Sequence, residues 1–116
     1  MKTLIARLEA ATGPDRGLDA EIGALIGDHD SRVYLARSGM PDQHFVSPPL
    51  YTESIDAAMT LVPKVFDDGL MGWGDSSQCT LYNHNLGVSV IVDGDGATPS
   101  LALCIAALKA REANYG

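Results

Sequence analysis

The sequence is short of basic side chains, and this shortage limits the partners that the protein can bind. Eight Lys and Arg residues stand against fifteen Asp and Glu residues in 116 positions, which gives a formal net charge of −7. A negative protein repels the phosphate backbone of nucleic acids and the surface of anionic membranes. We therefore expect neither a nucleic-acid polymer nor a membrane as the partner.

Long hydrophobic runs and a secretory signal are also missing. No stretch approaches the roughly 18 apolar residues that a bilayer-spanning helix needs, and the N-terminus has one lysine but no apolar signal core. Cysteine is scarce, with only Cys79 and Cys104. A disulfide between them is one alternative, but we interpret them as two buried reduced thiols. These features predict a cytoplasmic protein.

The short motifs of the common nucleotide-binding and hydrolytic sites are absent: G-x-S-x-G, G-x-x-x-x-G-K and G-x-G-x-x-G do not occur. Residues 28–30 (Asp-His-Asp) and 42–44 (Asp-Gln-His) offer metal ligands, but turn-forming aspartates explain both clusters. On a strand, Cys79 and His84 would point to opposite faces, so they do not form a nucleophile and base. We expect no enzymatic activity, catalytic residue, metal or cofactor. A metal-dependent hydrolase is the third-ranked alternative.

The clearest element that is present is the last helix, residues 98–112. Thr98 is a good N-cap and Pro99 suits the first helical position. Leu101, Ile105 and Leu108 recur at helical spacing, and the alanines between them make the helix apolar most of the way round. Such a helix belongs in the middle of a small protein or in a subunit contact. Its apolar surface exceeds what one sheet can cover, so we predict a homo-oligomer, a dimer.

The rest of the chain alternates between helical and strand-like patterns. Helices are expected at 2–12, 17–26 and from Thr52 or Ser54 to Val62, with Gly27 closing the second. Strands are expected at 69–75, 79–84 and 86–92, with a tight turn at 83–85, and residues 93–96 are read as a turn. The fold class is therefore α+β: a small antiparallel sheet flanked by helices on both faces, in a single domain, residues 1–116.

Residues 28–52 show the least regular pattern. A structureless loop of about 25 residues is unusual in a small domain, so one or two short strands are expected here, as a hairpin at the edge of the sheet. The segment is read either as a solvated connection or as a loop over a binding site.

Two blocks of the sequence resemble a known family. Residues 51–63 (YTESIDAAMTLVP) and 97–110 (ATPSLALCIAALKA) are similar to blocks of the small bacteriophage and prophage proteins grouped as the phage ABA sandwich domain. The resemblance covers about residues 15–112. It implies a small antiparallel sheet flanked by helices and a phage origin, and it carries no catalytic residue over to this chain.

The candidate ligand-binding residues are Trp73, Tyr82, His84, Arg32 and Arg37. A tryptophan between two glycines can lie flat against a ligand, and Tyr82 and His84 share a strand face that could extend the aromatic surface. The two arginines could supply contacts to an anion. The alternative is that Trp73 covers the core and that the arginines are solvated.

The resemblance implies a small, non-catalytic phage or prophage accessory protein. Our first hypothesis is that it sequesters a small anionic, nucleotide-like signalling molecule of the host and so counters host defence. The alternative is a protein–protein adaptor, or an inhibitor of a host protein, that uses exposed apolar surface.

Overall fold

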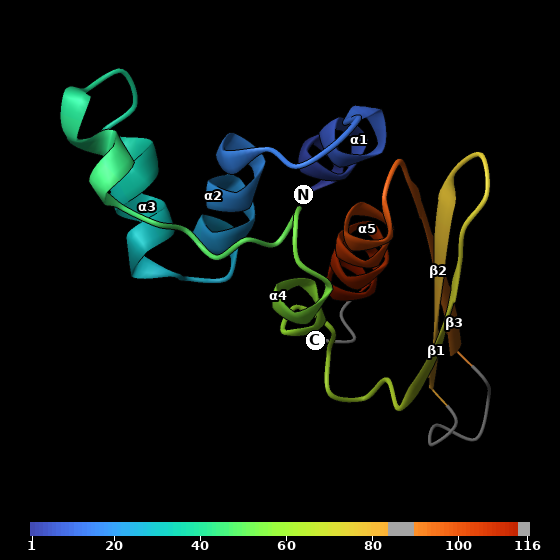
Figure 1. Ribbon diagram of the computed structural model, residues 1–116. Helices are drawn as coiled ribbons and strands as arrows, with labels where there is room; N and C mark the ends of the chain where they lie inside the picture. Colours follow the sequence, from blue (N-terminus) through green and yellow to red (C-terminus); the bar gives the residue numbers. More distant parts are fainter. Residues whose placement is uncertain (84–89, 114–116) are drawn as a thin grey trace.

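The chain forms helices in its first half and at its end, with a β-sheet between them (Figure 1). The computed structural model describes residues 1–83 and 90–113. In chain order the elements are α1 (Lys2–Ala10), α2 (Arg16–Leu25), α3 (His29–Ala36), the 3₁₀ helix η1 (Pro41–Phe45), α4 (Ile55–Met59), β1 (Asp68–Gly72), β2 (Ser77–Asn83), β3 (Val90–Gly96) and α5 (Pro99–Glu112). The structure thus confirms the α+β class.

The three strands form one antiparallel sheet in the order β1-β2-β3. Because side chains alternate along a strand, Cys79 and Leu81 of β2 face the helices and are buried, while Leu70 of β1 and Ile91 of β3 face away and are exposed. Figure 1 shows the described helices on one side of the sheet, with α5 packed against β2 and β3. The sheet is therefore packed against helices as expected, but on one face instead of both.

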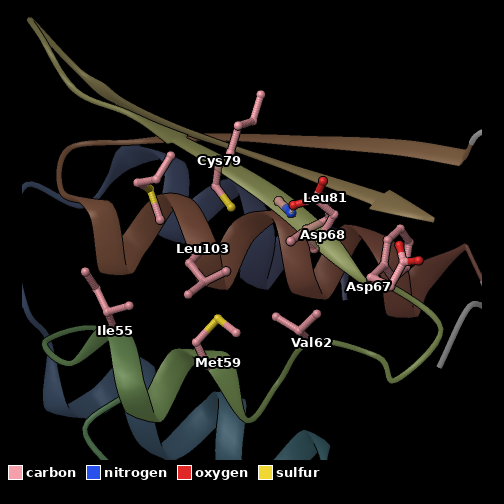
Figure 2. A pocket seen from close by; sticks show the side chains of 12 residues that line it. Ile55, Met59, Val62, Asp67, Asp68, Cys79, Leu81 and Leu103 are labelled. Carbon is pink, nitrogen blue, oxygen red and sulfur yellow. Dashed lines mark hydrogen bonds between the residues drawn. The ribbon is translucent and has the colours of Figure 1, made fainter. Parts of the chain in front are cut away.

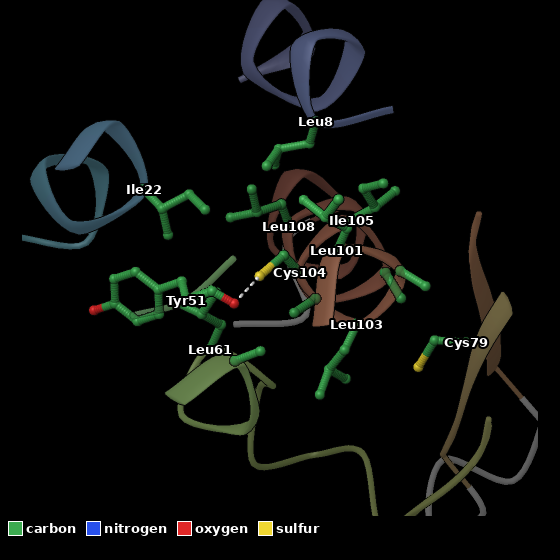
Figure 3. Close-up of a cluster of buried hydrophobic side chains, with 14 of the residues drawn as sticks. Leu8, Ile22, Tyr51, Leu61, Cys79, Leu101, Leu103, Cys104, Ile105 and Leu108 are labelled. Atoms are coloured by element: carbon green, nitrogen blue, oxygen red, sulfur yellow. Dashed lines mark hydrogen bonds between the residues drawn. The ribbon is translucent and has the colours of Figure 1, made fainter. Parts of the chain in front are cut away.

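Helix α5 lies at the centre of the core, as its apolar pattern predicts. Thr98 caps it by accepting a hydrogen bond from the Leu101 N–H at 3.2 Å. Every side chain from Leu101 to Leu108 is buried. Figure 3 shows why: α1, α2 and the segment around Leu61 surround the helix on one side, and β2 lies on the other. A single chain therefore covers the helix. The reason for expecting a dimer does not hold, and the dimer itself stays a prediction.

Residues 93–96, read as a turn from the sequence, are instead the end of β3. Gly94 and Gly96 face α5, and both are buried. A Cβ at position 94 would lie 2.5 Å from the backbone oxygen of Ala102 and 2.5 Å from the backbone nitrogen of Ala106. The two glycines thus let β3 approach the backbone of α5 more closely than any side chain would allow.

Residues 28–52 contain helices, so the hairpin expected there is wrong. Asp28 caps α3 by accepting hydrogen bonds from the N–H of Ser31 at 2.9 Å and from its hydroxyl at 2.6 Å. These bonds hold the pKa of Asp28 below its usual value. Ser31 itself is buried against Gly23 of α2, where any side chain would collide with it. A local cap and one close contact therefore build an α2–α3 helix pair.

A buried carboxylate fastens residues 46–52 to α2. Asp19 accepts hydrogen bonds from the N–H and the hydroxyl of Thr52, at 2.7 and 2.8 Å. The guanidinium of Arg16 lies 2.6 Å from the other Asp19 oxygen and also donates to the carbonyl of Pro48. A buried charge is tolerated only when it is paired and hydrogen-bonded in this way.

The remaining elements lie close to their predicted positions. Gly27 has φ +91°, as expected of the residue that closes α2, and Ser54 caps α4 by accepting from the Ala57 N–H at 3.2 Å. Of the strand expected at 86–92, residues 90–92 lie in β3, which continues to Gly96; residues 86–89 and most of the turn expected at 83–85 lie outside the described residues. Both cysteines are free and buried, as predicted. Among the described residues, no helix combines the length and the apolar character that a membrane crossing requires.

Candidate functional site

The structure places the predicted anion-binding arginines far from the predicted aromatic surface. Arg32 lies on α3 and Arg37 caps its C-terminal end, where it forms an ion pair with Asp42. Figure 1 shows α3 at one end of the molecule and the sheet at the other, along an axis of 50 Å. The two arginines therefore cannot line one pocket with Trp73 and Tyr82 of the same chain.

The two aromatic residues of the predicted site also lie apart. Trp73 follows directly on β1 and is 81% exposed, so it does not cover the core. Tyr82 pairs with Asp68 at the opposite end of β1. Trp73 lies five residues beyond Asp68 along the chain, and five residues of extended strand span about 16 Å. His84 lies outside the described residues. The single anion-and-aromatic pocket expected from the sequence is not formed by these side chains.

The clusters considered for metal binding or nucleophilic catalysis have structural roles where the structure describes them. Asp28 caps α3, and Asp42 pairs with Arg37. In residues 1–83 and 90–113, no three potential metal ligands come together. Burial, with a smaller effect of Asp93, raises the pKa of the Cys79 thiol to about 11. Burial beside Asp19 raises that of Cys104 to about 12. Both thiols are therefore protonated at neutral pH and are poor nucleophiles.

A groove with a mostly apolar lining and a volume of about 290 Å³ lies at the edge of the sheet; we call it the α4–β1 groove (Figure 2). Figure 2 shows Ile55, Met59 and Val62 pointing from the α4 side toward Leu103 of α5, with β2 above them. The groove is lined by Ile55, Met59, Val62, Phe66, Asp67, Asp68, Gly69, Leu70, Met71, Cys79, Leu81 and Leu103.

The groove has a buried floor and an exposed apolar rim. Leu81 and Leu103, at 5% and 2% exposed, belong to the core. On the rim, Ile55 is 46% exposed and Met59 53%, and Val62 and Met71 are partly buried. Single exposed apolar side chains are ordinary, but several around one concave surface indicate a binding site.

Acidic side chains set the charge around this groove. Asp67 and Asp68 belong to its lining. Residues 53–75, which carry α4 and β1, contain five acidic side chains and one basic side chain, Lys64. This stretch of the chain therefore has an excess of acidic side chains, which favours basic groups over anions.

The sequence contains the apolar residues of this site, but their helical spacing alone does not show that they are exposed. Ile55 and Met59 stand at i and i+4, the spacing of a buried stripe. In the structure both are about half exposed, because α4 has a single turn beyond its cap and ends at Met59 before it meets the sheet. Only the position of α4 relative to β1 turns this stripe into a rim.

Together, these features define a small α+β protein with a one-sided sheet and an apolar, acid-rimmed groove at the edge of that sheet. Comparison with protein-family models, with curated proteins and with solved structures gives no match. The resemblance to the phage ABA sandwich domain therefore stays a prediction from residues 51–63 and 97–110.

Proposed function

We propose that this is a non-catalytic protein–protein adaptor or inhibitor, and that it holds an apolar, basic segment of its partner in the α4–β1 groove. The observation that carries the proposal is the half-exposed apolar rim of Ile55 and Met59 above a buried floor. Covering such a rim removes apolar surface from water, which favours binding by about 25 cal/mol per Å².

The setting rests on the resemblance described above. A phage or prophage accessory protein that acts in the host cytoplasm has host proteins as its natural partners. An adaptor or inhibitor needs a recognition surface and no catalytic group. The α4–β1 groove provides such a surface, because Ile55 and Met59 on its rim lie outside the core cluster and stay about half exposed.

Peptide display against the immobilised protein tests the proposal. The selected peptides should combine apolar residues with Lys or Arg, because the groove is apolar and its surroundings are acidic. Ile55→Gln and Met59→Gln should each weaken their binding about tenfold, since each removes roughly 1.4 kcal/mol of apolar contact.

The matched control is Leu25→Gln. Leu25 is 45% exposed at the end of α2, almost the same exposure as Ile55, but it lies outside the groove. Binding to this variant should equal binding to the wild-type protein. Peptides that bind equally well to all three variants would contradict the proposal.

Sequestration of an anionic, nucleotide-like molecule is the second candidate function, and one observation favours it. Trp73 is 81% exposed, and the glycines on both sides of it face open space, so the indole is free to stack on a planar ligand. The acidic surroundings oppose an anion, and any contact to Arg32 or Arg37 would have to come from a second copy. Trp73 is the only tryptophan, so its fluorescence reports this binding directly. Salt-sensitive quenching by a nucleotide would place this function first.

A further inference from the structure

Strand β1 is an edge of the sheet, and the α4–β1 groove lies beside it. Among residues 1–83 and 90–113 the strand order is β1-β2-β3, so within this part of the chain β1 pairs only with β2. Every second residue of an edge strand directs its N–H and C=O away from the neighbouring strand. These groups form a template to which another strand can pair.

The helices leave room beside this edge. α5 packs mainly against β2 and β3, and α4 packs against α5. In Figure 2 the groove lies between α4 and the sheet, with Leu103 between them. A fourth strand added next to β1 would therefore extend the sheet over α4. Alternate side chains of that strand would point toward Ile55 and Met59.

We infer that the segment bound in the groove is an extended polypeptide that pairs with β1 as an additional strand. This inference rests on the proposed function and specifies its mode of binding. Hydrogen bonds to the β1 backbone supply sequence-independent affinity, and the groove selects apolar side chains at every second position. The five residues of β1 span about 16 Å, so five to seven residues of the partner are engaged.

Charge identifies the chemistry of the occupant. The acidic excess of residues 53–75 favours a segment that carries Lys or Arg at its ends. It disfavours a second copy of this chain, because each copy carries a net charge of −7. The Asp68 carboxylate accepts a hydrogen bond from the Gly69 N–H at 2.7 Å. That contact keeps the Asp68 carboxylate beside the backbone of the edge strand.

The probe for the test is the peptide acetyl-Lys-Val-Thr-Val-Thr-Val-Lys-amide with the wild-type full-length chain. Its valines share one face, and its N–H groups point alternately to the two edges of an extended strand. N-methylation of the central valine and of a neighbouring threonine gives two matched variants, one of which loses a hydrogen bond to β1. We expect that variant to bind about tenfold more weakly and the other to bind within about twofold of the parent peptide. Hydrogen exchange of the β1 amides should slow when the parent peptide binds.

The inference fails if both N-methylated peptides lose affinity equally, if neither does, or if the β1 amides gain no protection. It also fails if the peptide does not bind at millimolar concentration. A dimer seen by light scattering, with β1 amides already protected before peptide is added, would show that a second copy occupies the edge. In each of these cases, display peptides that still require Ile55 and Met59 would leave the proposed function standing.

Discussion

Replacing Gly94 with alanine should separate β3 from α5, the closest packing contact of the sheet. The added Cβ would lie 2.5 Å from two backbone atoms of α5, those of Ala102 and Ala106. Real Cβ contacts are essentially never shorter than 3.0 Å, so the strand and the helix must move apart by about 0.5 Å. The obstructing atoms belong to the backbone, and no side-chain rotation can relieve the clash.

The size of the effect follows from two opposing contributions. Overpacking a core costs about 1–3 kcal/mol, and two backbone clashes place Gly94→Ala at the upper end of that range. Alanine also restricts the unfolded chain more than glycine does, which stabilises the folded state by about 0.4–1 kcal/mol. The net destabilisation is therefore about 2 kcal/mol. For a urea m-value near 2 kcal/mol/M, the unfolding midpoint falls by roughly 1 M.

Gly72→Ala is the control for this measurement. Gly72 also lies in a strand, but a Cβ there meets no atom within 4 Å. This variant should unfold at the wild-type midpoint or up to about 0.5 M above it. Urea unfolding followed by circular dichroism measures both. Equal midpoints for the two variants would refute the argument that glycine is required for the approach of β3 to α5.

Three further predictions concern buried polar groups. The folded-state pKa values of Cys79 and Cys104, about 11 and 12, lie above the ordinary value of 9.0. The protonated thiols therefore contribute fully to stability below pH 9, and this contribution is lost as the pH rises from 9 toward 12, because in this range the unfolded chain releases the thiol protons and the folded chain retains them. Urea unfolding midpoints that stay constant between pH 9 and 12 would contradict this prediction. Native protein should also resist iodoacetamide at pH 8, whereas urea-unfolded protein reacts. Asp19→Ala leaves the buried N–H of Thr52 without its acceptor and leaves its hydroxyl only the longer contact, 3.3 Å, to the carbonyl of Asp15. This should cost about 1–3 kcal/mol in thermal unfolding, and an unchanged melting temperature would show that the network carries no stability.

Residues whose structure depends on near neighbours in the chain were predictable from the sequence. Thr98 and Pro99 mark the start of α5, Gly27 closes α2 and Ser54 caps α4, each through contacts within a few residues. The α+β class follows from the same local patterns, because a switch between helical and alternating spacing marks where the sheet begins.

Elements that depend on distant contacts were not predictable. α3 contains the strand-like run of residues 33–35 (Val-Tyr-Leu), and a helix of eight residues is marginal by itself. It is held by the Asp28 cap and by the contact of Ser31 with Gly23. The end of β3 contains two glycines, which weaken an isolated strand, and only the approach of α5 explains them.

The candidate site shows the same division. The sequence by itself determined that Ile55 and Met59 are apolar, that residues 53–75 are acidic and that Trp73 stands between glycines. The tertiary structure decided that α4 and β1 face each other across a groove, and that α3 carries its arginines to the opposite end of the molecule. The physical reason is that local sequence controls the identity and spacing of side chains, whereas their meeting across the molecule depends on how the elements pack around α5.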